Sequence, residues 1–260
     1  MIHVTTSQIK EFKNCRFKFW LSYRKLLKPR IEPEALTIGS SYHDKVEQIL
    51  KTGDFIPTDE PTDAMARAFK KYILPSIPKI IATEKQFSVQ LSEDVWLDGK
   101  IDAIAEGCLV EHKTTKNYID EGYLYRVHFI DNQVTNYLIA TENQPVCYTV
   151  ITKPTIRIKK DESMPEYIKR CEEWYDTETY KKVKVFFTGR TDEQLEKQRQ
   201  DIINIAREMK NCENWYKNET ACLLGKCQFS GICPSYKDNM ELVDFEYKQA
   251  VNEELNEEEN

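Results

Sequence analysis

The chain has 260 residues, of which 40% are hydrophobic and 31% are charged, and its formal net charge is −6 at pH 7. This length accommodates one large domain, or a main domain with a small appendage. No apolar run approaches the roughly 18 residues of a membrane span, and the first residues lack the apolar core of a secretion signal. We therefore expect a cytoplasmic protein with no membrane partner.

The charge is unevenly distributed along the chain. Residues 1–30 contain eight basic residues and one acidic residue, whereas residues 237–260 contain nine acidic and two basic residues. A basic segment and an acidic end suit a body that binds a polyanion, with a tail that is solvated or competes for the same surface. The alternative is an ordinary polar surface followed by a disordered end. We place a single domain at residues 1–236 and a flexible acidic tail at 237–260.

In chain order the hydrophobic pattern predicts helices at residues 6–27, 40–52 and 61–73, a strand at 84–91 and a hairpin within 95–115. It then predicts a helix at 127–141, a strand at 145–152 and a long helix at 192–217. Gly53 stands where the second helix should end, and a capping box from Thr191 to Gln194 should open the last one. This order predicts an α/β fold with a mixed sheet flanked by helices.

The predicted hairpin brings charged side chains together. We take Glu106 and Gly107 as the two turn residues. Asp102 then lies opposite Glu111, and Lys113 shares their face because side chains alternate along a strand. Opposed carboxylates destabilise a sheet unless a cation lies between them, so the pair indicates a site for Mg²⁺ or Mn²⁺. The alternative is a solvated strand face with incidental charges, and another turn length would shift the register.

The cysteines point to a second kind of site. In a cytoplasmic chain of this size a disulfide framework is not expected. Three of the eight cysteines fall within twelve residues, in the stretch "CLLGKCQFSGIC". This clustering favours metal ligation.

Taken together and in order, these residues resemble the RecB-like branch of the PD-(D/E)XK nuclease superfamily. The family pattern appears here as Gly39–His43 ("GSSYH"), Asp102 in "GKIDAI", Glu111–Lys113 ("EHK") and Gln133–Tyr137 ("QVTNY"), with Glu84 ahead of the hairpin. The resemblance covers about residues 5–236. It implies a restriction-endonuclease-like fold and hydrolysis of DNA phosphodiester bonds by metal-activated water.

The resemblance also implies a role for each motif residue. The metal ligands would be His43, Asp102, Glu111 and the backbone carbonyl of His112. The catalytic residues would be Asp102, Glu111 and Lys113. The residues that position the substrate strand would be Gln133 and Tyr137. Lys113 would orient the attacking water and stabilise the developing negative charge.

One subgroup of this branch carries a [4Fe–4S] cluster and includes the iron–sulfur nucleases of CRISPR adaptation, the AddB subunit and related viral and repair exonucleases. By this resemblance the cluster ligands are Cys15, Cys222, Cys227 and Cys233, and the cluster would join the N- and C-terminal helical segments. The interval between Cys222 and Cys227 is longer than the subgroup's usual one, and Arg16 replaces the usual proline after the first ligand. Cys212 is therefore the alternative to Cys222. Zinc or free thiols are the other interpretations.

The expected substrate is single-stranded DNA or strand ends. The basic residues of segment 1–30 are interleaved with aromatic residues, and cations for phosphates with rings for bases are typical of single-strand binding. The alternative is that these rings belong to the core. The setting would be recombination, repair or a viral pathway, with a helicase or recombinase as partner. Two further hypotheses are a nuclease that trims DNA for CRISPR adaptation with an integrase, and a non-catalytic module that binds DNA ends.

Overall fold

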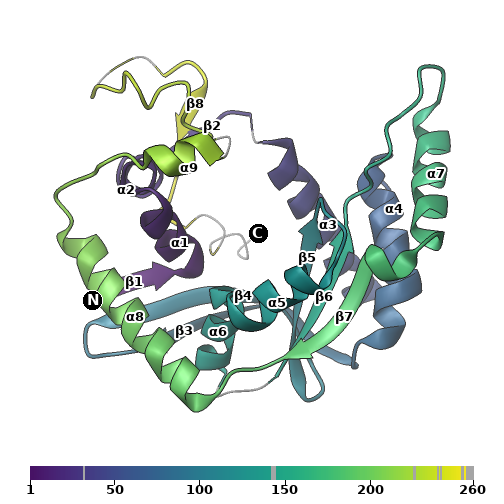
Figure 1. Ribbon diagram of the computed structural model, residues 1–260, viewed down its shortest axis with the longest axis horizontal. Helices are drawn as coiled ribbons and strands as arrows, with labels where there is room; N and C mark the ends of the chain where they lie inside the picture. Colours follow the sequence, from purple (N-terminus) through teal and green to yellow (C-terminus); the bar gives the residue numbers. More distant parts are fainter. Residues whose placement is uncertain are drawn as a thin grey trace. The chain divides into compact units, whose positions relative to one another are not determined.

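The structure is a computed structural model that describes residues 1–31, 33–141, 145–224, 227–238, 240, 242–252 and 255. The chain forms two compact units (Figure 1). Unit 1 comprises Met1–Pro33, Gln86–Gly99 and Glu196–Asn260, and unit 2 comprises Glu34–Lys85 and Lys100–Leu195. The chain passes from one unit to the other between Pro33 and Glu34, and again within β3 (Ile80–Gln90), β4 (Val95–Ala105) and α8 (Asp192–Asn211).

Unit 2 is built on a mixed sheet. The last residues of β4 pair antiparallel with β5 (Cys108–Thr115), β5 pairs parallel with β6 (Val146–Thr152), and β6 pairs antiparallel with β7 (Val183–Thr188). The helices of the unit are α3 (Glu34–Thr52), α4 (Pro61–Ala68), α5 (Glu121–Phe129), α6 (Asn132–Ala140) and α7 (Met164–Asp176). Shorter helical segments cover Phe69–Ile73, Leu74–Ser76 and Thr179–Lys181. The predicted mixed sheet with flanking helices is confirmed.

The apolar core of unit 2 lies between the sheet and α3, α4 and α7. Tyr42 of α3, Phe69 after α4, and Tyr175 of α7 are fully buried in one cluster with Ile151 of β6. Side chains alternate along β6, so Tyr148 faces the opposite side of the sheet. There it stacks on Phe186 of β7, at 5.1 Å between ring centroids. α5 covers that opposite side.

Unit 1 contains the two ends of the chain. β1 (Ile2–Thr5) pairs parallel with the first residues of β4, and β2 (Leu27–Pro29) pairs antiparallel with β8 (Phe245–Tyr247). Its helices are α1 (Thr6–Asn14), α2 (Arg16–Phe19), a π-helical segment at Trp20–Arg24, α9 (Glu219–Leu224) and most of α8. One apolar cluster among the described residues of this unit has four buried members, namely Leu21, Leu27, Phe229 and Phe245.

Two predicted helices are interrupted. The expected helix at 6–27 breaks at Cys15, whose φ of −159° is extended and whose Sγ accepts a hydrogen bond from the backbone N–H of Lys18 (3.4 Å). The expected helix at 127–141 is instead α5 and α6, because Asp131 caps α6 by accepting from the N–H of Gln133. The last predicted helix ends at Asn211 rather than at residue 217. Its capping box is confirmed by the two reciprocal bonds between Thr191 and Gln194.

Part of the segment predicted as a flexible acidic tail, 237–260, forms a strand. Residues 245–247 form β8, and Phe245 is 7% exposed and stacks on Phe229 at 5.5 Å between ring centroids. The apolar residues among the acidic ones therefore hold this part of the segment on unit 1. Residues 239, 241, 253–254 and 256–260 lie outside the described residues. Among the described helices, none combines the length and the apolar character that crossing a membrane requires.

Candidate active site

The β4–β5 hairpin sets the position of the acidic residues. Its two-residue turn ends at Gly107, whose φ of +78° is a conformation that glycine adopts without strain. The register pairs Ala103 with Val110, as the sequence predicts. Asp102 and Glu111 are the next residues along the two strands, and the charge of Asp102 acts on Glu111. The hairpin therefore brings the two carboxylates together on the face of the sheet predicted for them.

The two carboxylates are shielded from solvent. Only 1% of the Glu111 side chain and 15% of the Asp102 side chain are exposed. Burial raises the pKa of Glu111 to about 7, and the charge of Asp102 adds to the shift. Burial also raises the pKa of Asp102 to about 6, although the charge of Lys113 opposes it. Negative charge is thus held where water screens it poorly, so a cation bound here would be strongly favoured.

Lys113 connects the acidic pair to α6. Its Nζ forms an ion pair with Glu111 and donates a hydrogen bond to Oε1 of Gln133 (2.9 Å). Nε2 of Gln133 donates to Oη of Tyr137 (2.8 Å), and that hydroxyl donates to the carbonyl oxygen of Lys100 (2.9 Å). Burial alone would lower the pKa of Lys113, but the two carboxylates raise it, so the ammonium stays charged. The three predicted residues thus form one hydrogen-bonded chain.

The ring of His112 points away from the carboxylates. Its Nδ1 lies 2.7 Å from Oγ1 of Thr149 on β6, and the ring packs edge-on against Phe69. Burial lowers the pKa of this imidazole to about 3, so the ring is neutral. The backbone N–H of His112 nevertheless donates to Oδ2 of Asp102 (2.8 Å). The backbone of His112, not its ring, therefore belongs to the site.

His43 extends from α3 toward Asp102. Its Nδ1 lies 3.7 Å from Oδ2 of that carboxylate. Burial lowers the pKa of His43, so its neutral ring can act as a metal ligand. Gly39 lies one helical turn earlier, and a Cβ at that position would meet no atom of the described residues within 4 Å, its own helix backbone aside.

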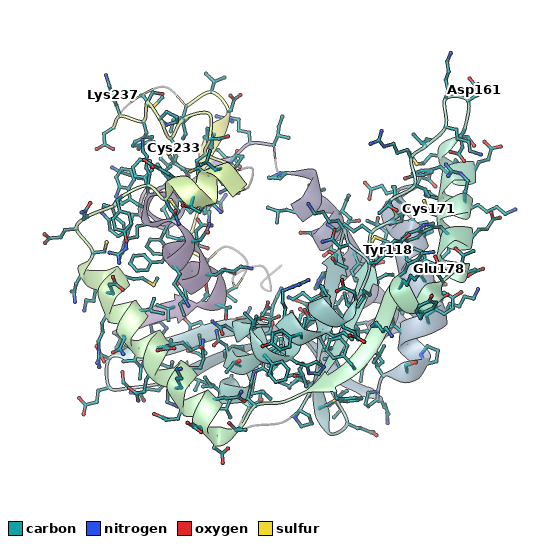
Figure 2. All side chains as sticks on the ribbon, viewed as in Figure 1. Tyr118, Asp161, Cys171, Glu178, Cys233 and Lys237 are labelled. Carbon is teal, nitrogen blue, oxygen red and sulfur yellow. The ribbon has the colours of Figure 1, made fainter. Side chains whose placement is uncertain are left out.

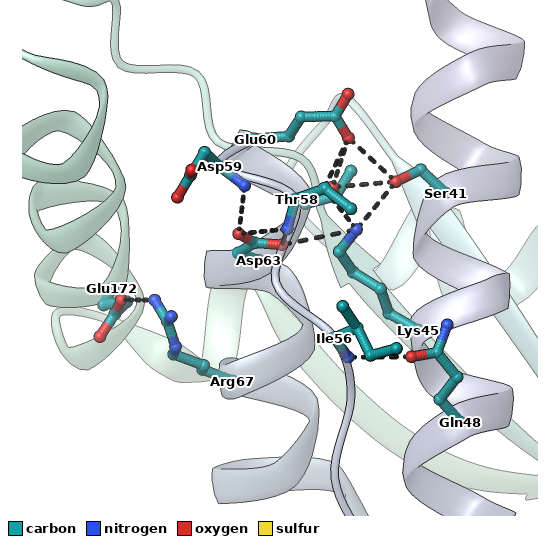
Figure 3. A network of polar contacts seen from close by, with 11 residues as sticks. Ser41, Lys45, Gln48, Ile56, Thr58, Asp59, Glu60, Asp63, Arg67 and Glu172 are labelled. Atoms are coloured by element: carbon teal, nitrogen blue, oxygen red, sulfur yellow. Dashed lines mark hydrogen bonds and ion pairs between the residues drawn. The ribbon is translucent and has the colours of Figure 1, made fainter.

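A buried ion pair fixes the helix that carries His43. Lys45 and Asp63 are 3% and 1% exposed, and Nζ of Lys45 lies 3.4 Å from Oδ1 of Asp63. The same Nζ donates to Oγ1 of Thr58 (2.8 Å), and Asp63 accepts the backbone N–H groups of Thr58 and Asp59 (Figure 3). The pair therefore joins α3, α4 and the loop between them.

Glu84 lies near the same carboxylates. Its Oε2 forms an ion pair with Nζ of Lys100 (2.6 Å). Its charge also acts on Asp102, raising the pKa of that carboxyl, although burial contributes more. The structure therefore brings Glu84 into the electrostatic environment of the site, where the family pattern would place it.

The donor set fits a hard divalent cation. Apart from the ion pair with Lys113, neither carboxylate oxygen of Glu111 has a hydrogen-bond partner among the described residues. Asp102 supplies a second carboxylate, and Mg²⁺ and Mn²⁺ prefer such oxygens. In the described part of the chain, no three side chains of His, Cys, Asp or Glu form a ready metal cage. Mg²⁺ usually keeps several water molecules and is bound through one or two carboxylates, which Asp102 and Glu111 would supply.

The cysteines predicted as cluster ligands all belong to unit 1. Cys15 is buried, Cys227 and Cys233 are half-buried, and Cys222 is exposed. Figure 2 labels Cys233 in this unit. Burial raises the pKa of Cys233, and the other three predicted ligands are near enough for their charges to raise it further. Among the described residues, however, these thiols do not form a group of three or more side chains placed to hold a metal ion.

Cys212, the alternative to Cys222, has other contacts. Its Sγ lies 3.9 Å from Nη1 of Arg16 and 3.4 Å from the carbonyl oxygen of Asn214. Lysine charges act on two of the predicted ligands. Lys18 lowers the pKa of Cys227 and Lys217 lowers that of Cys233, although burial has the larger effect and raises both. Positive charge beside several thiols suits a cluster with thiolate ligands.

The sequence pattern does not indicate some of the residues that support the site. Thr149 was assigned to an apolar strand, although a single threonine inside "VCYTVIT" is a signal for a buried hydrogen bond. Lys45 and Asp63 were not singled out, because they lie 18 positions apart in two separate helices. No local pattern marks such a pair, since its geometry arises only when the helices pack.

One solved structure has the same fold as this chain. A provisionally designated exonuclease from Eubacterium rectale matches over 93% of this chain and 90% of that chain, with a TM-score of 0.52 and 13% sequence identity. This chain shares the fold of that protein. At such low identity the likeness concerns the fold alone.

Two other solved structures match less closely. A phage-related exonuclease from Haemophilus somnus 129PT covers 65% of this chain and 79% of its own, with a TM-score of 0.38 and 12% identity. An alkaline exonuclease from Laribacter hongkongensis covers 86% of this chain and 95% of its own, with a TM-score of 0.35 and 12% identity. Searches with protein-family models and against curated protein sequences found no match.

Proposed function

We propose that this protein is a metal-dependent deoxyribonuclease that acts as an exonuclease on single-stranded DNA or strand ends. One observation carries the proposal: two buried carboxylates, Asp102 and Glu111, converge beside a charged lysine, Lys113. The shared fold with a protein designated an exonuclease agrees with it. An intact set of acids and lysine also favours an enzyme over a module that only binds DNA ends.

Asp102 and Glu111 would hold one or two Mg²⁺ or Mn²⁺ ions, with His43 and the backbone carbonyl of His112 as further ligands. When bound, the cation would neutralise phosphate oxygens and lower the pKa of a bound water molecule. The pKa values of the two carboxyls, about 7 and about 6, mean that protons partly occupy this site in the free protein. Cation binding would therefore release protons.

Lys113 would act on the reacting groups directly. Its ammonium, charged and beside Glu111, can orient the attacking water and stabilise negative charge on the phosphate in the transition state. Gln133 accepts one of its hydrogen bonds and is itself held by Tyr137, so the direction of the ammonium is fixed. Gln133 and Tyr137 would also line the path of the substrate strand.

We further propose that Cys15, Cys222, Cys227 and Cys233 hold a [4Fe–4S] cluster. Its role would be structural, because it would join the start of α2 to the segment that follows α9 within unit 1. The alternative is a zinc ion bound by the same four thiolates. The biological setting proposed is recombination, repair or a viral pathway with a helicase or recombinase partner; trimming of DNA with an integrase in CRISPR adaptation would use the same chemistry.

The activity is tested with DNA strands blocked at either end, alongside duplex, RNA and circular controls. We expect degradation of linear single strands with Mg²⁺ or Mn²⁺, none with a chelator, and none by the Lys113→Ala protein. Cleavage of open ends but not of circles would establish an exonuclease. Undiminished cleavage by Lys113→Ala would rule out this active site.

The cluster is tested by the colour, iron, sulfide and zinc content of the protein purified without oxygen. We expect a brown protein that loses iron in Cys233→Ala but not in Cys171→Ala, since Cys171 is a buried thiol of unit 2. A colourless protein that contains zinc would replace the cluster by a zinc site. Cleavage assays on the same preparations keep the two proposals separate.

A further inference from the structure

The solvent face of α5 carries aromatic rings. Tyr125 and Phe129, four positions apart, are 58% and 64% exposed, and their ring centroids lie 4.9 Å apart. Arg126 is exposed on the same face, whereas Val127 is buried. Amphipathic helices ordinarily turn such rings toward the core. This helix instead presents two neighbouring rings and a guanidinium to water.

The opposite side of α5 is firmly attached to unit 2. Nη2 of Arg190 donates to the carbonyl oxygens of Val127 and Asp131, each at 3.1 Å. The ring of His128 packs on Phe186 of β7 at 5.0 Å between centroids. Because the buried side is fixed by these contacts, the two exposed rings are held in a set direction rather than free to fold inward.

The helix is also close to the catalytic residues. Asp131, two residues after Phe129, caps α6 by accepting from the N–H of Gln133 (2.9 Å). Oε1 of Gln133 accepts the hydrogen bond of Lys113 Nζ (2.9 Å). Two hydrogen bonds in sequence therefore connect Asp131, just after the exposed aromatic face, to the lysine of the proposed active site.

We propose that Tyr125, Arg126 and Phe129 form a stacking platform for unpaired bases of the substrate strand beside the active site. The inference rests on the proposed function. It adds that the protein binds the unpaired bases of the substrate strand beside the active site. Every base has a π-face, so a ring can bind any sequence, at roughly 1–3 kcal/mol per base. The guanidinium of Arg126 suits a neighbouring phosphate.

The size of the patch favours bases over a protein partner. One helix face with two rings and an arginine is sufficient to stack one or two bases. A stable protein interface covers about 20–30 residues on each side. Paired bases inside a duplex hide their faces from a ring, so the platform selects single strands or frayed ends.

The test measures DNA binding without cleavage. Full-length protein with Lys113→Ala is titrated, with Mg²⁺ present, against a fluorescent oligothymidylate of about 12 nucleotides, within the usual site size. We expect Tyr125→Ala or Phe129→Ala to weaken binding about 5- to 150-fold, and Phe129→Trp to preserve it. Phe187→Ala is the matched control, since Phe187 is 52% exposed and follows Phe186 on the other face of β7; its binding should not change.

An abasic strand separates stacking from other effects. On that strand Phe129→Ala should cost no more than about twofold, and the salt dependence of binding should stay that of the parent, because no phosphate contact is removed. Arg126→Ala should reduce the salt dependence. Equal losses on normal and abasic strands would overturn the platform. Unchanged DNA binding by Phe129→Ala would also overturn the platform. The same holds if that variant keeps its DNA binding but loses self-association.

The outcomes also separate this inference from the proposed function. Wild-type protein that cleaves single strands, with full binding by Phe129→Ala, would remove the platform and leave the nuclease. Wild-type protein that cleaves no strand, with a loss of binding confined to normal strands in Phe129→Ala, would remove the nuclease and leave a platform for bases. Thermal unfolding of each variant checks that the exposed substitutions leave the fold intact.

Discussion

The backbone N–H of His112 donates a hydrogen bond to Oδ2 of Asp102 across the β4–β5 hairpin, at 2.8 Å. The ring of the same histidine is fixed by Thr149 of β6, at 2.7 Å between Nδ1 and Oγ1. Three strands thus set the orientation of one carboxylate. The hydrogen bond also favours the ionised form of Asp102, which burial disfavours.

We expect Thr149→Val to weaken this arrangement. Valine has nearly the shape of threonine but leaves Nδ1 of His112 buried without a partner, which costs about 1–3 kcal/mol of unfolding free energy. Because the backbone of His112 orients Asp102, the affinity for Mn²⁺, followed by the electron paramagnetic resonance signal of the free ion, should fall as well. Thr149→Ser keeps the hydroxyl and should behave as the wild type. Unchanged stability and Mn²⁺ affinity in Thr149→Val would contradict a positioning role.

In the metal-free protein Glu111 and Asp102 should contribute stability that is lost as the pH rises, while the lowered pKa values of His112 and His43 contribute the opposite slope. The folded pKa values of Glu111 and Asp102, about 7 and about 6, lie above the unfolded values of roughly 4.3 and 3.9. The folded state therefore binds more protons at these two groups, and the extra stability is lost as the pH rises from about 4 through about 7. Urea unfolding in the presence of a chelator measures this slope.

Two comparisons check the origin of that slope. Glu111→Gln should remove the contribution of Glu111 from the measured slope, because the amide does not titrate, and Mg²⁺ should remove the contribution of both carboxyls in the wild type, because the cation replaces the protons. A slope that is the same in Glu111→Gln would mean that other groups cause it.

The charged site was predictable from the sequence because a hairpin obeys simple geometry. Once the turn is placed at 106–107, alternation alone puts Asp102, Glu111 and Lys113 on one face, and the register agrees. The same alternation turns the ring of His112 to the other face, where Thr149 binds it. Gln133 and Tyr137 could be placed on one side of a helix for a similar reason, their spacing of four.

The interruptions of helices could not be predicted in the same way. Residues 6–27 have a helical pattern, but Cys15 takes an extended conformation and its sulfur caps the next helix. Thiols are not usual capping groups, so the local sequence gives little warning. β8 was missed because its few apolar residues lie among acidic ones and become buried only on contact with Phe229.

Removing the charge of Lys113 should slow catalysis without preventing metal binding. Lys113→Met keeps the length of the side chain but cannot stabilise negative charge on the phosphate, so the cleavage rate should fall about 10²- to 10³-fold or more. Mn²⁺ affinity should not decrease, because a competing cation leaves the carboxylates. Lys70→Met is a suitable control, since Lys70 pairs with Asp54 away from these carboxylates. Equal rates for wild type and Lys113→Met at saturating metal would exclude a catalytic role.

The buried pair of Lys45 and Asp63 should support the metal site through α3. Lys45→Met leaves the carboxylate of Asp63 buried without its cation, which typically costs about 3–5 kcal/mol of unfolding free energy. Mn²⁺ affinity should also fall, because His43 lies two residues away on the same helix. Asp63→Asn in the Lys45→Met protein removes the unpaired charge while its amide oxygen can still accept the N–H groups of the 58–59 loop. We therefore expect the double variant to be more stable than Lys45→Met and to recover Mn²⁺ affinity, by urea unfolding and metal titration. If the second substitution instead adds its own full cost, the pair is not coupled and α3 is held by its apolar contacts alone.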